Sequence, residues 1–226
     1  GDVTLADHGA GKSYLGFILY DLFFKAKPVG WVYGVESRVE LVEKSAALAA
    51  RLGFDRMRFL ATTVQQALTD PDLPPTFDVV TALHACDTAT DDAIAFGLAK
   101  QARHMVLVPC CQAEVASVMR SSKALNLSRT PLAELWRHPL HTREFGSQIT
   151  NVLRCLQLEA HGYSVTVTEL VGWEHSMKNE LILASKTGTG HRAQRERASE
   201  RLQQVLDELG LQALRTRFGV VEQSAA

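Results

Sequence analysis

The chain has 226 residues, of which 46% are hydrophobic and 22% charged, and its formal net charge is −1. This composition is typical of a globular protein with a sizeable core, and no run of about 18 apolar residues predicts a membrane-spanning helix. The near-zero net charge excludes a generally basic nucleic-acid-binding protein, and four cysteines in so long a chain exclude a disulfide-rich scaffold.

The two ends of the chain suggest how it is divided. Gly1-Asp2-Val3 runs straight into an apolar segment, so we expect a natural N-terminal region to precede it. A breaker begins at Thr187, and we therefore expect a main domain over residues 1–186 and a C-terminal helical extension over residues 187–226. Cysteines kept as thiols indicate a reducing compartment, for which we expect the cytoplasm.

Short apolar runs alternate with longer segments of helical periodicity. Strands are predicted over Val3–Ala6, Gly30–Val35, Met57–Ala61, Phe77–His84, His104–Val108, Ser164–Val171 and Glu180–Ser185. Helices are predicted over Tyr14–Phe24, Val39–Leu52, Thr90–Gln101, most of residues 112–162, and His191–Leu209. In the first helix one face carries an apolar stripe, made of Tyr14, Leu15, Ile18, Leu19, Leu22 and Phe23.

Alternation of strands and helices predicts an α/β fold with a doubly wound, Rossmann-like sheet. The last two strands are joined only by residues 172–179, too few for a parallel crossover. We therefore expect seven strands, six parallel and the seventh antiparallel. Ligands of such sheets bind at the carboxyl ends of the strands.

A glycine-rich turn, Asp7-His8-Gly9-Ala10-Gly11-Lys12-Ser13, follows the first predicted strand and opens a helix. A phosphate is one ligand for such a turn, but a P-loop needs glycine where Ala6 stands. S-adenosylmethionine is the other, with Asp7 near its cationic end. Glu36 closes the second strand, 27 residues after Gly9, where a carboxylate can accept both ribose hydroxyls. The alternative is that this segment is an ordinary strand–helix turn that binds no ligand.

Polar residues and thiols follow the fourth and fifth strands. The fourth ends in Leu83-His84-Ala85-Cys86-Asp87 and continues to Asp91, and the fifth ends in Pro109-Cys110-Cys111-Gln112. Helix capping explains one or two of these residues, and small buried cysteines are common in cores. A further polar loop contains Glu174, His175, Lys178 and Asn179, in which His175 is a candidate general base.

The segments 7–14, 84–92, 109–112 and 174–179 together resemble a methyltransferase family. Its members include the ribosomal RNA adenine dimethylase domain-containing protein and the methyltransferase domain of glutathione S-transferase C-terminal domain-containing protein. The resemblance covers about residues 2–185. It implies the class I methyltransferase fold, S-adenosylmethionine as cofactor, and an RNA acceptor such as rRNA or tRNA.

The resemblance, together with the strand ends, implies three groups of site residues. Cofactor binding is expected of Asp7, Gly9, Gly11, Tyr14, Glu36, Ser37, Thr62, Leu83 and His84. Catalysis is expected of Cys86, Asp87, Cys110, Cys111 and His175. Substrate binding is expected of Asp91, Pro109, Gln112, Glu174, Lys178 and Asn179.

The local charge fits an RNA acceptor, since residues 101–155 carry seven basic and three acidic side chains. Arg120, Lys123, Arg129, Arg137 and Arg143 are candidates to steer phosphates, although an ordinary solvated face explains them equally well. We expect neither DNA nor a membrane as a partner.

Other chemistry remains open. Cys86 with Cys110 or Cys111 resembles the thiol pair of RNA cytosine-5 methyltransferases, in which a thiolate attacks the pyrimidine ring. A zinc site made from His84, Cys86, Cys110, Cys111 and His175 is a second alternative, although its spacing matches no common zinc motif. A non-catalytic scaffold that binds S-adenosylmethionine is a third.

Overall fold

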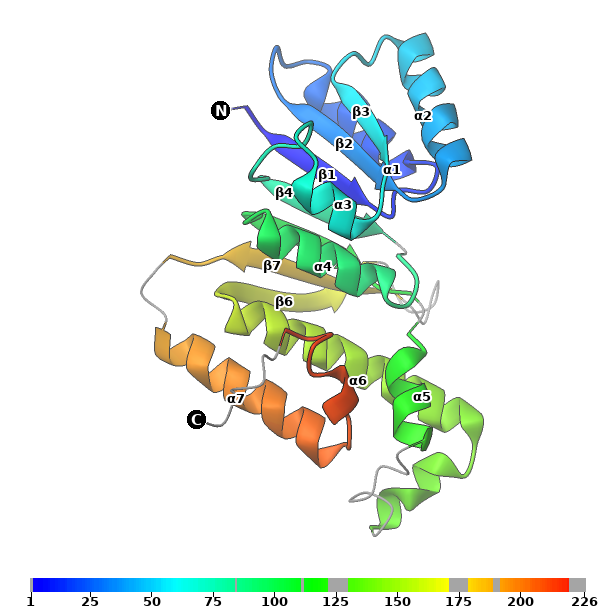
Figure 1. Ribbon diagram of the computed structural model, residues 1–226, viewed down its shortest axis with the longest axis vertical. Helices are drawn as coiled ribbons and strands as arrows, with labels where there is room; N and C mark the ends of the chain where they lie inside the picture. The colour runs from blue at the N-terminus through cyan, green and yellow to red at the C-terminus, as the bar shows by residue number, and fades with distance from the viewer. Residues whose placement is uncertain are drawn as a thin grey trace. The chain divides into compact units, whose positions relative to one another are not determined.

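The strands form one mixed sheet. A computed structural model describes residues 2–83, 85–110, 112–121, 130–170, 179–188 and 192–219. Within them the sheet has the order β3-β2-β1-β4-β5-β7-β6 (Figure 1). The strands are β1 (Thr4–His8), β2 (Trp31–Glu36), β3 (Met57–Ala61), β4 (Val79–Leu83), β5 (His104–Val108), β6 (Tyr163–Glu169) and β7 (Glu180–Lys186).

Pairing in the sheet follows the expected pattern. β1, β2, β3, β4 and β5 pair in parallel with their neighbours, whereas β7 runs antiparallel to β5. The predicted doubly wound sheet with an antiparallel seventh strand is therefore confirmed. Because the first five strands are parallel, their carboxyl ends lie along one rim.

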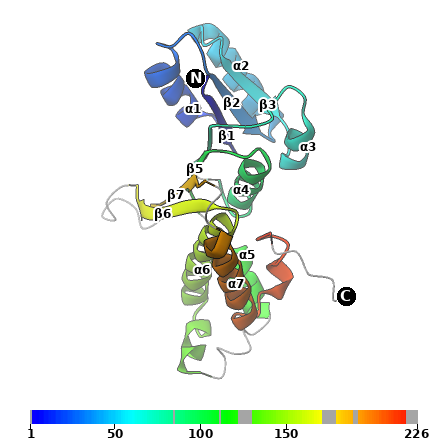
Figure 2. The ribbon, with the colours of Figure 1, turned by 90° about the vertical axis from the view of Figure 1, so that its left-hand side faces the viewer.

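The helices are α1 (Tyr14–Leu19), which continues as the π-helical turn η1 (Tyr20–Phe24), α2 (Val39–Leu52), α3 (Val64–Thr69), α4 (Ala89–Ala99), α5 (Glu114–Ser121), the 3₁₀ turn η3 (Pro131–Trp136), α6 (Pro139–Ala160), α7 (Arg192–Glu208) and the 3₁₀ turn η4 (Gln212–Leu214). Figure 2 shows α1 on one face of the strands and α4 on the other. The periodicity analysis missed α3, a short helix with a capping box between Thr63 and Gln66. No described helix is both long and apolar enough to cross a membrane.

The chain forms two compact units, and residues 1–85, 92–110 and 166–185 make the first. Part of its core lies between α1–η1 and the first strands, where Tyr20, Phe24 and Phe54 are buried beside Leu5 and Val32. The predicted stripe on the first helix is split: Tyr14, Ile18 and Leu22 are exposed, whereas Leu19 packs against this core. The helix instead turns Gly16 toward the sheet, where a Cβ would come within 3.5 Å of Val32.

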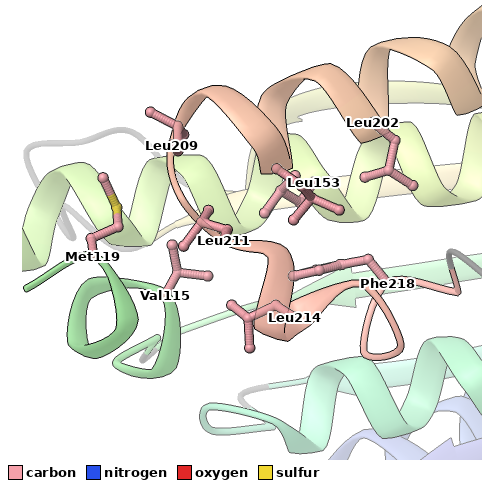
Figure 3. Packing of buried hydrophobic residues seen from close by; sticks show 9 residues of the cluster. Val115, Met119, Leu153, Leu202, Leu209, Leu211, Leu214 and Phe218 are labelled. Atoms are coloured by element: carbon pink, nitrogen blue, oxygen red, sulfur yellow. The ribbon is translucent and has the colours of Figure 1, made fainter. Parts of the chain in front are cut away.

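Residues 86–91, 111–165 and 186–226 make the second unit. Its core is an apolar cluster in which α5, α6, α7 and the residues after α7 meet (Figure 3). Leu202 and Leu206 of α7 pack there with Leu153 of α6 and Phe218. The C-terminal helix therefore buries its apolar face against the helices that follow β5.

Candidate cofactor and acceptor site

The glycine-rich turn begins at the carboxyl end of β1. Gly9, Gly11 and Ser13 all have left-handed backbone angles, with φ of 65°, 56° and 54°. Glycine adopts such angles without strain, which explains two of the three positions. The N–H of Gly9 donates to the carbonyl of Val35 at 2.9 Å, and this bond ties the turn to β2.

Glu36 ends β2 beside this turn. Its Oε2 accepts the N–H of Gly11 at 2.8 Å and Nη2 of Arg38 at 3.1 Å. Its Oε1 accepts the N–H of Arg38 at 3.1 Å, Nε of Arg38 at 3.0 Å and the hydroxyl of Ser37 at 3.3 Å. Burial by itself would raise the pKa of Glu36, but the hydrogen bonds from Arg38 and Gly11 hold it at about 2. The carboxylate is therefore charged at neutral pH.

Asp7 lies beneath the turn and is only 2% exposed. Its Oδ1 accepts the hydroxyl of Thr81 from β4 at 2.8 Å. Burial raises the pKa of Asp7 to about 6, although hydrogen bonds from Thr81 and the N–H of Gly16 oppose the shift. The carboxylate thus ties together β1, β4 and the start of α1.

His8, between Asp7 and Gly9, is a buried residue that the sequence analysis did not single out. Its ring lies 5.9 Å from that of Phe96, and neither ring nitrogen has a hydrogen-bond partner among the described residues. Burial lowers the pKa of His8 to about 4, despite the opposing charge of Glu36. The sequence signal was available, since a histidine stands inside the glycine motif itself.

The remaining predicted cofactor residues follow the same rim. Thr62 comes directly after β3, and its N–H donates to the carbonyl of Glu36 at 3.1 Å. Leu83 ends β4, and a Cβ on Gly9 would lie 3.5 Å from that of Ala85, two residues further on. Tyr14 is 67% exposed at the start of α1. His84 lies outside the described residues.

Three predicted acceptor-side residues interact with the protein's own groups. Asp87 has a φ of 51°, and its Oδ1 accepts the N–H of Ala113 at 3.0 Å, at the start of α5. Asp91 forms a buried, two-pronged ion pair with Arg154 at 2.7 and 2.8 Å. Gln112 is 6% exposed and bonds to Asn151 and Ser147 of α6. These bonds hold the segments after β4 and β5 against α6.

Four of the other acceptor-side residues lie in the described part of the chain. Cys86 is exposed, Cys110 is partly exposed, and Pro109 directly follows β5. Asn179 accepts the N–H of Leu170 at 2.8 Å, a bond between the ends of β6 and β7. Cys111, Glu174, His175 and Lys178 lie outside the described residues, as do Lys123 and Arg129.

No group of three or more histidine, cysteine, aspartate or glutamate side chains among the described residues is arranged to hold a metal ion. Three of the five residues of the zinc alternative, His84, Cys111 and His175, lie outside that part of the chain.

A pocket of about 440 Å³ lies elsewhere in the first unit, between α1–η1 and the sheet. Apolar side chains line most of it, including Leu5, Leu19 and Val79. Neither the glycine turn nor Glu36 lines this pocket. The candidate cofactor site is therefore located by the glycine turn and Glu36, and this pocket is separate from it.

Comparison with known proteins gave one family match. Residues 1–118 match a family model described as a methyltransferase domain. No curated protein matches the chain significantly. The matched residues contain the glycine turn, Glu36 and the residues that follow β4 and β5.

Solved structures share the fold at low sequence identity. An rRNA methylase from Streptococcus thermophilus has a TM-score of 0.51 and 8% identity, over 83% of this chain and 88% of that one. A fibrillarin/Nop5p complex gives a TM-score of 0.51 and 12% identity, over 82% and 73%. A precorrin-6y C5,15-methyltransferase from Geobacter metallireducens gives a TM-score of 0.46 and 17% identity, over 82% and 80%.

Proposed function

The chain belongs to the methyltransferase-domain family and is an enzyme whose methyl donor is S-adenosylmethionine, and we propose that its acceptor is RNA, either rRNA or tRNA. Within the family we place it near the two relatives that its sequence motifs resemble. We assign the methyltransferase domain to residues 1–186, the C-terminal helical extension to residues 187–226, and the protein to the cytoplasm.

The glycine turn and Glu36 fit the nucleoside part of this cofactor. Gly9 and Gly11 carry no side chains, so a ligand can approach the backbone of the turn closely. Glu36 is ionised beside the turn, where a carboxylate can accept both ribose hydroxyls. We assign the ribose to Glu36, and the rest of the cofactor to the rim formed by Gly9, Gly11 and the residues after β3 and β4.

The protein's part in the reaction is mainly alignment. The cofactor supplies a methyl group already activated by a sulfonium. The residues at the rim hold the reacting groups in line, which by itself lowers the barrier of a bimolecular transfer. Asp7 keeps the turn in place through Thr81 and the start of α1. We assign the acceptor side to the thiols and polar groups that follow β4 and β5.

The observation that carries the RNA proposal is a set of exposed arginines in the second unit. Arg120 of α5, Arg137 after η3 and Arg143 of α6 are exposed. Arg137 and Arg143 also pair with Glu134 and Glu144, at 2.9 and 3.3 Å. Arg154 belongs to the same basic segment but is buried against Asp91, so it is not part of this exposed set. One of the structures with the same fold is named an rRNA methylase, and this name supports an RNA acceptor.

Transfer of a labelled methyl group tests the proposal. The purified chain is incubated with tritiated S-adenosylmethionine and with total RNA or total protein from cells that lack the gene. We expect label in RNA that ribonuclease removes. Label confined to protein, or no label in either fraction, would contradict an RNA acceptor.

A charge variant tests whether these exposed arginines bind the acceptor. Changing Arg120, Arg137 and Arg143 to Gln should weaken RNA labelling about tenfold or more at low salt, because phosphate contacts are lost. The matched control changes Arg192, Arg195 and Arg197 of α7 to Gln, which removes equal charge elsewhere in the same unit. Affinity for S-adenosylhomocysteine should stay constant in both.

A further inference from the structure

Arg38 encloses the carboxylate that we assign to the ribose. Its Nε lies 3.0 Å from Oε1 of Glu36 and its Nη2 lies 3.1 Å from Oε2. The guanidinium therefore spans both oxygens at once. With the N–H groups of Gly11 and Arg38 and the hydroxyl of Ser37, the carboxylate accepts five hydrogen bonds.

Those five bonds leave no free acceptor position on Glu36. A carboxylate offers about four lone-pair directions, and a ribose diol needs two of them. The N–H donors of Gly11 and Arg38 belong to the backbone of the glycine turn and the start of α2, so they cannot leave without unfolding either. The Ser37 hydroxyl bonds only Oε1, at 3.3 Å, so its release would free one oxygen. The Arg38 guanidinium is the side-chain donor whose release frees a position on both oxygens.

The guanidinium is also easy to displace. The Arg38 side chain is 59% exposed, whereas that of Glu36 is 7% exposed. An arginine this exposed passes into water when released, and ion pairs with an exposed partner contribute little to stability. The Glu36 carboxylate would be costly to leave without partners, and the ribose hydroxyls can replace those it loses.

We propose that the Arg38 guanidinium is a latch on Glu36, which the ribose of the cofactor must displace in order to bind. The proposal rests on the assignment of the ribose to Glu36. Arg38 thereby sets the affinity for the cofactor without being needed to hold it. The guanidinium and the two ribose hydroxyls thus compete for the same oxygens of Glu36.

Calorimetric titration with S-adenosylhomocysteine tests the latch. Arg38→Ala removes the guanidinium and keeps the backbone donor, so we expect binding about threefold to tenfold tighter than in the wild type. The matched control is Arg103→Ala, which removes another exposed arginine of the same unit, paired with Asp78 at 3.3 Å. Binding by this control should change less than about twofold.

The dependence of ligand affinity on salt concentration provides a second test of the latch. Raising the sodium chloride concentration from about 0.05 to 0.5 M screens the pair, so wild-type affinity should rise relative to that of Arg38→Ala. Weaker or unchanged binding by Arg38→Ala would overturn the latch. Weaker binding would indicate that Arg38 contacts the ligand, and unchanged binding that Arg38 has no effect on ligand affinity. A general structural defect would not tighten binding.

The variant Glu36→Ala distinguishes the proposed role of Arg38 from the assignment of the ribose to Glu36, on which that role rests. If Glu36 holds the ribose, the variant should lose affinity for S-adenosylhomocysteine by about tenfold or more. Normal affinity in Glu36→Ala would overturn both the ribose assignment and the latch. Lost affinity in Glu36→Ala with unchanged affinity in Arg38→Ala would overturn the latch alone. Thermal unfolding of each variant is the control for retention of the fold.

Discussion

At the scale of single residues, Asp7 and His8 are buried neighbours with opposite pKa shifts. Burial raises the pKa of Asp7 from 3.8 to about 6 and lowers that of His8 from 6.5 to about 4. Asp7 therefore stabilises the folded state less as the pH rises from about 4 to 6. His8 stabilises it less as the pH falls from about 6.5 to 4, because the folded state resists its protonation. The two effects oppose each other in the same pH window.

Replacing Asp7 separates them. The folded-state pKa of Asp7 lies above the unfolded value, so its stabilisation is complete below about pH 4 and is lost above about pH 6. A shift of about two units corresponds to about 3 kcal/mol. We expect the unfolding free energy of Asp7→Asn, taken relative to the wild type, to rise by up to about this amount between pH 4 and pH 7.

Urea unfolding followed by tryptophan fluorescence measures this difference at several pH values. Because His8 and Glu36 are present in both proteins, their titrations cancel. The control is Leu22→Ala, at an exposed residue of η1 that carries no ionisable group and should leave the difference flat. A flat difference for Asp7→Asn would contradict the raised pKa of Asp7.

At the scale of elements, the contact between α5 and α6 depends on a glycine. A Cβ on Gly146 of α6 would come within 2.6 Å of the Cβ of Ala116 and within 2.8 Å of its backbone nitrogen in α5. Backbone atoms of a helix cannot turn aside as a flexible side chain can. The two helices approach this closely because position 146 has no side chain.

Gly146→Ala should therefore be destabilising even though alanine favours helices. We expect a loss of about 1–3 kcal/mol in unfolding free energy, because overpacking forces the helices apart. Val152→Ala, at a residue of α6 that is 45% exposed, should change it by less than about 0.5 kcal/mol. Denaturant unfolding of both variants measures this, and a stabilised Gly146→Ala would contradict the packing described.

At the scale of the whole molecule, segments far apart in the sequence meet through a buried ion pair. Arg154 and Asp91 are 63 residues apart, and their side chains are 1% and 5% exposed. Nη2 of Arg154 also donates to the carbonyl of Asp87 at 2.9 Å. A single guanidinium thus holds the segment after β4 against α6.

Breaking this pair should cost far more than removing it entirely. Arg154→Met leaves a buried carboxylate without its partner, so we expect a loss of about 3–5 kcal/mol. The double variant Asp91→Leu with Arg154→Met should lose much less than the sum of the two single changes. The exposed pair Arg192–Glu196 provides the control cycle, with a coupling below about 1 kcal/mol. Additive losses at Asp91 and Arg154 would contradict the buried pairing.

Local sequence signals predicted most elements of the sheet. Met57–Ala61 and His104–Val108 have the bounds expected of them, and Gly53 has the positive φ of a helix C-cap. These features depend on residues close together in the chain. The same holds for the glycine turn, because Gly9, Gly11 and Glu36 follow two strands whose carboxyl ends share one rim.

The sequence by itself determined the succession of strands and helices, the antiparallel direction of the seventh strand, and the rim where the carboxyl ends of the parallel strands meet. These features follow from periodicity and connection length, which are local properties of the chain. Only the tertiary structure decided which charges have partners. It paired Asp91 with Arg154, placed Arg38 across Glu36, and left Tyr14, Ile18 and Leu22 of the predicted stripe exposed. Such outcomes depend on which surfaces meet in space, and for Asp91 the deciding residue lies 63 positions away.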